Sequence, residues 1–151
     1  MADTPCIVLI VDDDLNDRTL LKHAFKKAAA HVDLRIAKDA FQAEDYLSCR
    51  GEFADRAAHP LPALILLDLK MPRKSGFEFL SWIKTRPACS RIPVIVLSSS
   101  QESCDIDRAY ELGAKSYLVK SVDLKELIRI VEGIGAYATL LSSKSEAQPT
   151  R

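Results

Sequence analysis

Apolar and polar positions along the chain follow two alternating patterns. One pattern is a short apolar run or a strict apolar–polar alternation, which is typical of strands. The other repeats apolar residues every three to four positions, which is typical of one face of a helix. The strand patterns cover residues 6–11, 32–39, 62–69, 94–98 and 115–120, and the helix patterns cover residues 14–28, 40–47, 77–85, 104–112 and 122–141.

Strands that alternate with helices in this way predict an α/β doubly wound fold, in which a parallel sheet carries helices on both faces. Residues 48–62 fit neither pattern, and Gly51 and Pro60 within them predict an extended connection. We therefore expect one domain over residues 1–141, followed by a frayed polar tail over residues 142–151.

The composition excludes several classes of protein. The 21 basic and 21 acidic residues cancel, so charge gives no reason to expect nucleic acid or an anionic membrane as a partner. No apolar stretch approaches the roughly 20 residues that a membrane-spanning helix needs. The N-terminus lacks the basic start of a signal peptide, and the four cysteines form no C-x-x-C pair. We therefore expect a cytoplasmic protein with reduced thiols.

Polar side chains stand at the ends of four of the five expected strands. Asp12 and Asp13 follow the first strand, Asp68 ends the third, Ser98 ends the fourth and Lys120 ends the fifth. The carboxyl ends of parallel strands meet at one edge of a sheet, where doubly wound folds bind their ligands. We therefore expect the carboxylates, the hydroxyl and the ammonium group to lie together at that edge.

This set of side chains suits one kind of chemistry. Clustered carboxylates repel one another unless a cation lies among them, and hard oxygen ligands suit Mg²⁺. Mg²⁺, Lys120 and the Ser98 hydroxyl could together hold a phosphoryl group, for which a carboxylate is a known acceptor. Taken alone, Asp12 and Asp13 also fit a second explanation, as the N-cap and first-turn acids of the following helix.

Four stretches of the sequence resemble the response-regulator receiver domain, the phospho-acceptor half of a two-component signalling pair. They are VDDD, LLDLKMPRKSG, VIVLSSS and GAKSYLVKS, which occur in the family's order between residues 5 and 140. The family's Met-Pro and Gly after the phosphorylated Asp occur here as Met71, Pro72 and Gly76 after Asp68. The resemblance implies a flavodoxin-like (βα)5 fold and a Mg²⁺-dependent transfer of a phosphoryl group to Asp68 from a sensor histidine kinase.

The resemblance also implies a set of metal ligands. Asp13 would bind Mg²⁺ directly, Asp12 would bind mainly through water, and Asp68 and the backbone carbonyl of Lys70 would complete the set. Asp14 is expected to be only a solvated residue at the start of the loop.

Further roles follow from the resemblance for residues of the last two strands. Ser98 takes the place of the switch hydroxyl, Lys120 bridges the phosphoryl group and the acid pair, and Tyr117 matches the aromatic residue that turns inward on activation. Ser121 departs from the family, which usually has a cis proline there. Both a trans bond and a strained cis bond between Lys120 and Ser121 stay open at this point.

The partners implied are all proteins. The insertion at residues 48–62 resembles the stand-alone regulators that partner bacterial phytochromes and similar sensor kinases, and output would pass to a downstream protein or phosphotransfer partner. On the last expected helix, Ile130, Ile134, Tyr137 and Leu141 form a second apolar stripe. The stripe predicts a homodimer through this helix, and the alternative is a wider core face.

Other functions stay open on the sequence alone. A pseudo-receiver would bind partners without taking phosphate, and a phosphorelay sink would take phosphate without signalling further. An enzyme that hydrolyses an aspartyl phosphate would need a second acid or base near Asp68, such as a D-x-D arrangement, but Leu69 and Lys70 follow Asp68. We therefore expect a phospho-acceptor with slow self-dephosphorylation and not an enzyme, and we expect Lys70 and Ser100 to tune the phosphoryl lifetime.

Overall fold

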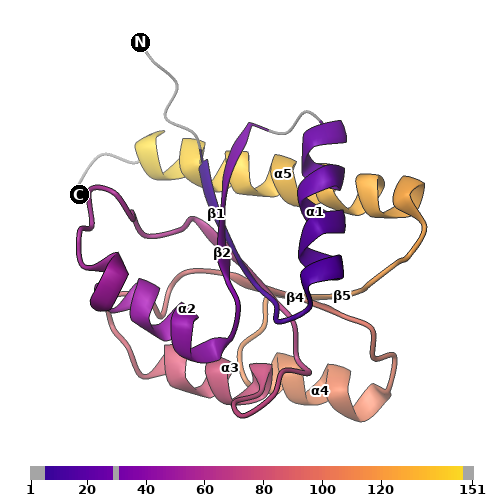
Figure 1. Cartoon of the computed structure of the whole chain (residues 1–151), viewed down its shortest axis with the longest axis horizontal. Helices are drawn as coiled ribbons and strands as arrows, with labels where there is room; N and C mark the ends of the chain where they lie inside the picture. Colours follow the sequence, from indigo (N-terminus) through magenta and orange to yellow (C-terminus); the bar gives the residue numbers. More distant parts are fainter. Residues whose placement is uncertain (1–5, 29–30, 148–151) are drawn as a thin grey trace.

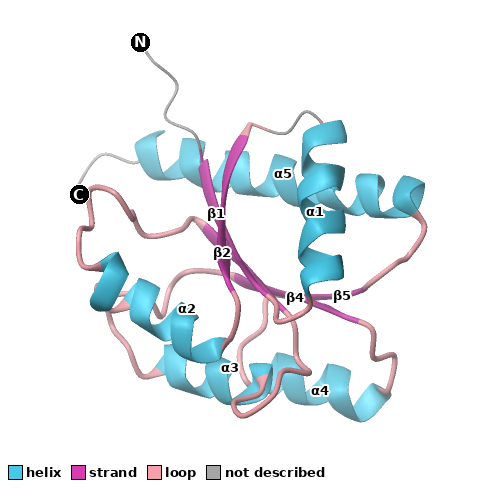
Figure 2. Ribbon diagram, in the orientation of Figure 1, coloured by secondary structure: helices cyan, strands magenta, loops and turns pink. Residues whose placement is uncertain are grey.

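The computed structural model describes residues 6–28 and 31–147, with side chains as far as Leu141. Its strands form one parallel sheet in the order β2-β1-β3-β4-β5 (Figures 1 and 2). The strands are β1 (Cys6–Val11), β2 (Val32–Ala37), β3 (Leu64–Leu67), β4 (Val94–Ser98) and β5 (Ser116–Val119). The helices are α1 (Leu15–Lys27), α2 (Ala40–Leu47), the 3-10 helix η1 (Gly51–Phe53), α3 (Gly76–Lys84), α4 (Ser103–Glu111) and α5 (Leu124–Ala147).

Helices cover both faces of the sheet, as Figure 1 shows: α1 and α5 lie on one side, and α2, α3 and α4 lie on the other. Successive side chains of a strand point to opposite faces. Val8 and Ile10 of β1 therefore join the core under α1 and α5. Leu9 and Val11 join the core on the other face. The predicted doubly wound, flavodoxin-like fold is confirmed.

The connection between α2 and β3 is folded where the sequence predicted an extended segment. Its 3-10 helix η1 places Phe53 in the core, with the ring centroid 5.1 Å from that of Tyr46. The Tyr46 hydroxyl donates a 2.8 Å hydrogen bond to the carbonyl of Pro60. The prediction was wrong here because these aromatic contacts, which no local periodicity reveals, fold the insertion back onto α2.

Helix α5 runs to Ala147, past the predicted end at Leu141. The segment from Ser142 to Ala147 contains no Gly or Pro to stop a helix, and Pro149 is the first residue that would. The tail predicted over residues 142–151 therefore begins as helix, and residues 148–151 lie outside the described part of the chain.

The remaining element bounds agree with the expected ones to within a few residues, and those of β1, α2 and β4 agree at both ends. The four cysteines are free thiols. None of the described helices is both long and apolar enough to cross a membrane. The carboxyl ends of β1, β3, β4 and β5 open onto one edge of the sheet, and the polar side chains described next lie there.

Candidate functional site

Three carboxylates meet where β1 and β3 end. The two strands are neighbours in register, and the backbone N–H of Asp68 donates a 2.9 Å bond to the carbonyl of Val11. One oxygen each from Asp12, Asp13 and Asp68 lies within 4.8 Å of the others. We call these three residues the acid cluster. The structure brings them together as expected from the parallel order of the strands.

Burial sets the electrostatics of the acid cluster. Asp12 is 2% exposed and Asp68 is 8% exposed, whereas Asp13 lies at the surface. Burial raises the pKa of Asp68 to about 6, with the charges of Asp12 and Asp13 adding to the rise and Lys120 opposing it. Burial also raises the pKa of Asp12. Desolvated carboxylates that repel one another are the donor set that a hard divalent cation such as Mg²⁺ stabilises.

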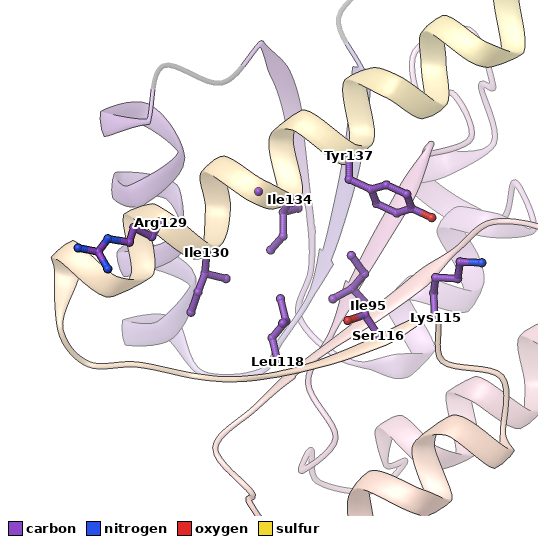
Figure 3. Close-up of a pocket in the computed structure, with 9 residues that line it drawn as sticks. Ile95, Lys115, Ser116, Leu118, Arg129, Ile130, Ile134 and Tyr137 are labelled. Atoms are coloured by element: carbon purple, nitrogen blue, oxygen red, sulfur yellow. The ribbon is translucent and has the colours of Figure 1, made fainter.

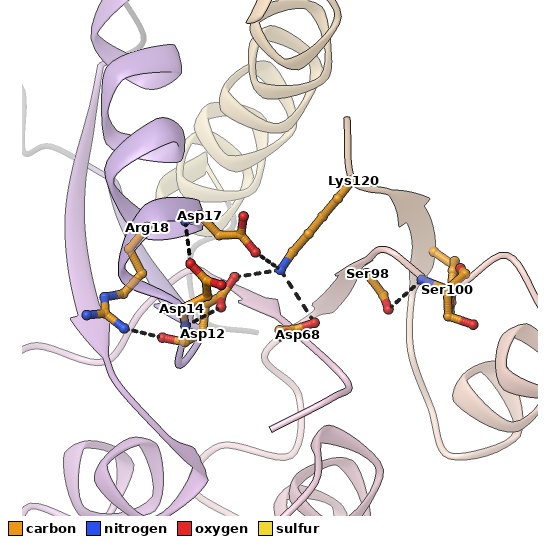
Figure 4. A network of polar contacts seen from close by, with 9 residues as sticks. Asp12, Asp14, Asp17, Arg18, Asp68, Ser98, Ser100 and Lys120 are labelled. Carbon is orange, nitrogen blue, oxygen red and sulfur yellow. Dashed lines mark hydrogen bonds and ion pairs between the residues drawn. The ribbon is translucent and has the colours of Figure 1, made fainter. Parts of the chain in front are cut away.

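Lys120 reaches into this cluster from the end of β5 (Figure 4). Its Nζ lies 2.7 Å from Asp17, 2.9 Å from Asp12 and 3.6 Å from Asp68. Burial by itself would lower the pKa of Lys120, but the hydrogen bonds to Asp17 and Asp12 outweigh it and hold the pKa above its ordinary value. The lysine is therefore a fixed positive charge next to Asp68.

Asp17 is the site residue that sequence reasoning missed, because an acid in the first turn of a helix is already explained by the helix dipole. A signal was present in its spacing. Asp17 stands four residues after Asp13, one helical turn beyond the loop that follows β1. A side chain at that position returns to the edge of the sheet where the strand ended.

Asp14 caps helix α1, which it was not expected to do. Its carboxylate accepts a 3.1 Å bond from the backbone N–H of Asp17, and its own N–H donates a 3.0 Å bond to Asp12. The alternative that made Asp12 or Asp13 the N-cap is therefore wrong. The expectation that Asp14 is only a solvated residue is also corrected, since Asp14 fixes the start of α1 beside the acid cluster.

The loop from β3 to α3 folds back tightly behind Asp68. The backbone N–H of Gly76 donates a 2.9 Å bond to the carbonyl of Leu69. A Cβ atom at Gly76 would lie 2.7 Å from the Cα of Leu69 and closer still to the carbonyl oxygen of Asp68, so only glycine fits. Lys70 lies in this loop, and its backbone N–H lowers the pKa of Asp68, against the larger effect of burial.

Two ion pairs tie the same loop to the neighbouring part of the fold. Arg73, whose φ of 69° lies in the left-handed region, pairs with Asp39 at 2.7 Å. Lys74 pairs with Glu44, which is nearly buried on α2. Both ion pairs join the loop after Asp68 to α2, because Asp39 is the N-cap of that helix and Glu44 lies within it.

A second group of residues, Ser98, Ser100 and Tyr117, forms what we call the hydroxyl side. The buried Ser98 Oγ accepts a 3.2 Å bond from the backbone N–H of Ser100. The Tyr117 hydroxyl donates a 2.8 Å bond to the carbonyl of Ser100, and the Ser100 hydroxyl donates a 2.6 Å bond to Asp105 of α4. Figure 4 shows Ser98 and Ser100 on the side of Asp68 away from Asp17.

The segment after Lys120 keeps an ordinary backbone although it lacks the family's proline. Every described peptide bond is trans, including the one between Lys120 and Ser121. The Ser121 hydroxyl accepts a 3.1 Å bond from the N–H of Asp123 and donates a 2.9 Å bond to Glu126. Ser121 thus organises the entry to α5 by hydrogen bonds.

The apolar stripe on α5 divides between core and surface. Ile134 is buried, Ile130 and Tyr137 are half-buried, and all three line a groove of about 480 Å³ between α5 and β5 (Figure 3). Leu118 of β5 forms the opposite wall. Leu141, the last residue of the stripe, is half-buried. Ile134 therefore belongs to the core under α1 and α5, and Ile130 and Tyr137 pack against the same core while they also line the groove.

Comparison with known proteins gives a consistent result. Residues 8–132 match the model of the response regulator receiver domain. The response regulator Rcp1 of Synechocystis sp. is 38% identical over 136 residues, which cover 90% of each chain. The structure of the phosphorylated cyanobacterial phytochrome response regulator RcpA superposes with a TM-score of 0.81 at 35% identity, covering 90% of this chain and 95% of RcpA. The Mn²⁺-bound form of Rcp1 gives a TM-score of 0.77 over 88% of this chain and 94% of that one.

Proposed function

This chain belongs to the response regulator receiver domain family, and on that premise we propose that Asp68 accepts a phosphoryl group from a sensor histidine kinase in a Mg²⁺-dependent reaction. One observation carries the proposal. Asp68 is a buried carboxylate within the acid cluster and 3.6 Å from the ammonium group of Lys120. Asp12 shares these surroundings, but only Asp68 is followed by the family's Met-Pro and Gly, as Met71, Pro72 and Gly76. An incoming phosphoryl group would meet a nucleophile and a positive charge at one place.

In the proposed transfer, an oxygen of Asp68 forms a bond to phosphorus while the bond from phosphorus to the kinase histidine breaks. The released imidazole nitrogen takes a proton from solvent. Lys120 then contacts the phosphoryl oxygens, and the Ser98 hydroxyl donates a hydrogen bond to them. The residues act by position and charge, which is the main contribution of proteins to phosphoryl transfer.

Asp12, Asp13, Asp68 and the backbone carbonyl of Lys70 are proposed to hold Mg²⁺. The donor set fits, since the oxygens of the acid cluster converge within 4.8 Å and burial leaves them in need of a cation. The Mn²⁺-bound form of Rcp1 supports a divalent cation in a relative of this chain. When bound, Mg²⁺ neutralises the charge that the carboxylates and the phosphoryl group share.

We further propose that the chain is a phospho-acceptor and not a hydrolase. Loss of phosphate would then be the slow attack of water on phosphorus, which returns the Asp68 carboxylate and inorganic phosphate. The two residues after Asp68 support this, since Leu69 is buried and apolar and Lys70 is basic, so the chain lacks a D-x-D arrangement at Asp68. Lys70 and Ser100 stay the proposed determinants of the phosphoryl lifetime, and both contact Asp105.

The proposed kinase partner is a bacterial phytochrome, because RcpA is a phytochrome response regulator by name and aligns over 95% of its length. The proposed downstream partner is a protein or a phosphotransfer domain that recognises the surface near Tyr117, in the cytoplasm. The contacts of a surface next to a buried site change when that site gains charge.

A homodimer through α5 is the third proposed contact. The groove beside Ile130 and Tyr137 (Figure 3) is largely apolar, and a second copy of α5 would cover it. Sedimentation equilibrium at tens of micromolar protein would give a dimer mass, and Tyr137→Asp would return it to the monomer mass. A monomer mass for the unmodified chain, with and without a phosphodonor, would contradict this contact.

The proposed function is tested by intact mass spectrometry after incubation with acetyl phosphate. The unmodified chain should gain one phosphoryl group with Mg²⁺ and none with EDTA, and Asp68→Asn should gain none. Asp14→Asn, which keeps a capping side chain next to the cluster, should react like the unmodified chain. An adduct that persists in Asp68→Asn would contradict the assignment, and no adduct with any small donor would favour a pseudo-receiver.

A further inference from the structure

Lys120 makes its shortest contact with an acid outside the acid cluster. Its Nζ lies 2.7 Å from Asp17 but 3.6 Å from Asp68, so the lysine leans toward α1 and away from the proposed acceptor (Figure 4). We propose that Asp17 is a positioning residue that holds Lys120 off Asp68 and thereby keeps the acid cluster available to a divalent cation. This inference rests on the proposed function, because it concerns the metal site of the same reaction.

The position of Asp17 is fixed from two directions. Its backbone N–H is bound by the N-cap residue Asp14 at 3.1 Å, which sets the first turn of α1. The next residue, Arg18, is buried and donates a 2.9 Å bond from Nη1 to the carbonyl of Asp12. Helix α1 is therefore tied to the loop that carries the acid cluster, which places the Asp17 carboxylate next to Lys120.

The ammonium group of Lys120 and a divalent cation compete for the same carboxylate oxygens. Lys120 already contacts Asp12 at 2.9 Å, so its remaining partner would be Asp68 if Asp17 did not attract it. A lysine seated on Asp68 would neutralise the cluster and oppose the entry of a cation. Asp17 offers the lysine another negative partner, and the charge of the cluster is left for the metal.

Asp17 is also suited to release the lysine later. Its side chain is 39% exposed, whereas those of Asp12 and Asp68 are 3% and 9% exposed. An exposed partner loses little when an ion pair breaks, because water replaces it. A cavity of about 140 Å³ lies beside the pair, lined in part by Asp17, Lys120 and Ser121, so the lysine side chain has room to turn. A phosphoryl group on Asp68 would then draw Lys120 away from Asp17.

An ordinary first-turn acid would behave differently. An acid that acts only through the helix dipole changes the stability of α1, and its effect on metal binding does not depend on Lys120. The proposed role requires that dependence, so a double-mutant cycle separates the two explanations.

The experiment is a calorimetric titration of Mg²⁺ alone into the full chain, with no phosphodonor. The set is the unmodified protein, Asp17→Asn, Lys120→Met and the double variant, with Asp14→Asn as the matched control for removing one acid from the same turn. We expect Asp17→Asn to weaken Mg²⁺ binding by about three- to tenfold and Asp14→Asn by less than about twofold. In the Lys120→Met background, Asp17→Asn should change the affinity no more than Asp14→Asn does. Lys120→Gln repeats the cycle if Lys120→Met does not give the far-ultraviolet circular dichroism of the folded chain.

Equal effects of Asp17→Asn with and without Lys120 would overturn the role of Asp17. An effect no larger than that of Asp14→Asn would overturn it as well. If the unmodified chain binds no Mg²⁺, both this inference and the proposed metal site fail. If it binds Mg²⁺ and is phosphorylated at Asp68 but shows no coupling, only the role of Asp17 fails.

Discussion

The acid cluster, which includes Asp68, and the hydroxyl side next to it are held together by different forces. The acid cluster consists of like charges, two of them buried, and the adjacent Lys120 has three acidic neighbours within 3.6 Å. The hydroxyl side consists of neutral hydroxyl groups. Those of Ser98 and Tyr117 hydrogen-bond the backbone of Ser100, and that of Ser100 donates to the Asp105 carboxylate. Buried charges are sensitive to any ion or charge that arrives, whereas neutral hydrogen bonds exchange at modest cost. The difference suits one side to chemistry and the other to its readout.

The largest effect expected on the acid cluster comes from Lys120→Met. Removing the fixed charge beside Asp68 should lower the rate constant of phosphorylation by acetyl phosphate about 100-fold, as the loss of one electrostatic stabiliser does in enzymes. Lys115→Met, which removes the same charge just before the start of β5, is the matched control and should change the rate less than about threefold. Stopped-flow or timed intact mass measurements give both rates. Equal rates for the two variants would remove Lys120 from the reaction.

The second effect is a dependence of stability on pH that belongs to Asp68. Its pKa is about 6 in the folded chain against an ordinary 3.8, so the folded state holds the proton more tightly and is destabilised as pH rises through 6. Asp68→Asn, which stays neutral, should match the unmodified chain near pH 4. Above about pH 6.5 in EDTA it should be more stable by about 3 kcal/mol.

Urea unfolding at several pH values measures this difference in the free energy of unfolding. Saturating Mg²⁺ should narrow it, because the cation binds the charged form of the unmodified chain. A difference that stays constant between pH 4 and pH 8 would mean that Asp68 is not desolvated as described.

The third effect tests the backbone behind the acid cluster. Gly76→Ala places a Cβ 2.7 Å from the Cα of Leu69, so the backbone must move to make room for it. The free energy of unfolding should therefore fall by about 3 kcal/mol. Gly133→Ala on α5 is the control, since a Cβ there meets nothing within 4 Å. It should stabilise the chain by up to about 1 kcal/mol, because alanine favours a helix. Denaturant unfolding midpoints measure both variants. An unchanged stability of Gly76→Ala would show that the loop is packed less tightly than described here.

The smallest effect is expected on the hydroxyl side. Ser98→Ala removes the acceptor for the Ser100 N–H, which should lower the free energy of unfolding by about 1 kcal/mol. It also removes the proposed hydrogen bond to the phosphoryl group, which should slow phosphorylation about fivefold. Ser99→Ala is the matched control, since Ser99 is exposed and next in sequence. Both rates come from the acetyl phosphate reaction. A fall in the phosphorylation rate as large as that of Lys120→Met would contradict the proposed difference between the acid cluster and the hydroxyl side.

The fold and the members of the acid cluster followed from the sequence for a simple reason. The spacing of apolar residues differs enough between strands and helices to distinguish them in the sequence. The carboxyl ends of parallel strands must then lie at one edge of the sheet. Asp12, Asp68 and Lys120 could therefore be placed together although they are far apart in the sequence.

Contacts that depend on the rotation of a helix or the path of a loop could not be predicted. The pairing of Asp17 with Lys120 depends on which side of α1 faces β5, and the burial of Phe53 depends on the fold of the insertion against Tyr46. The close approach behind Gly76 depends on how the loop returns to β3. Local periodicity carries no information on such tertiary pairings.

The most direct test of the account is to locate the phosphoryl group. Sodium borohydride reduces an aspartyl phosphate to homoserine, and peptide mass spectrometry then identifies the residue. After treatment with acetyl phosphate and Mg²⁺, the account predicts homoserine at position 68 and unchanged aspartates at positions 12, 13 and 17. Homoserine at any of those other positions, with Asp68 unchanged, would contradict it.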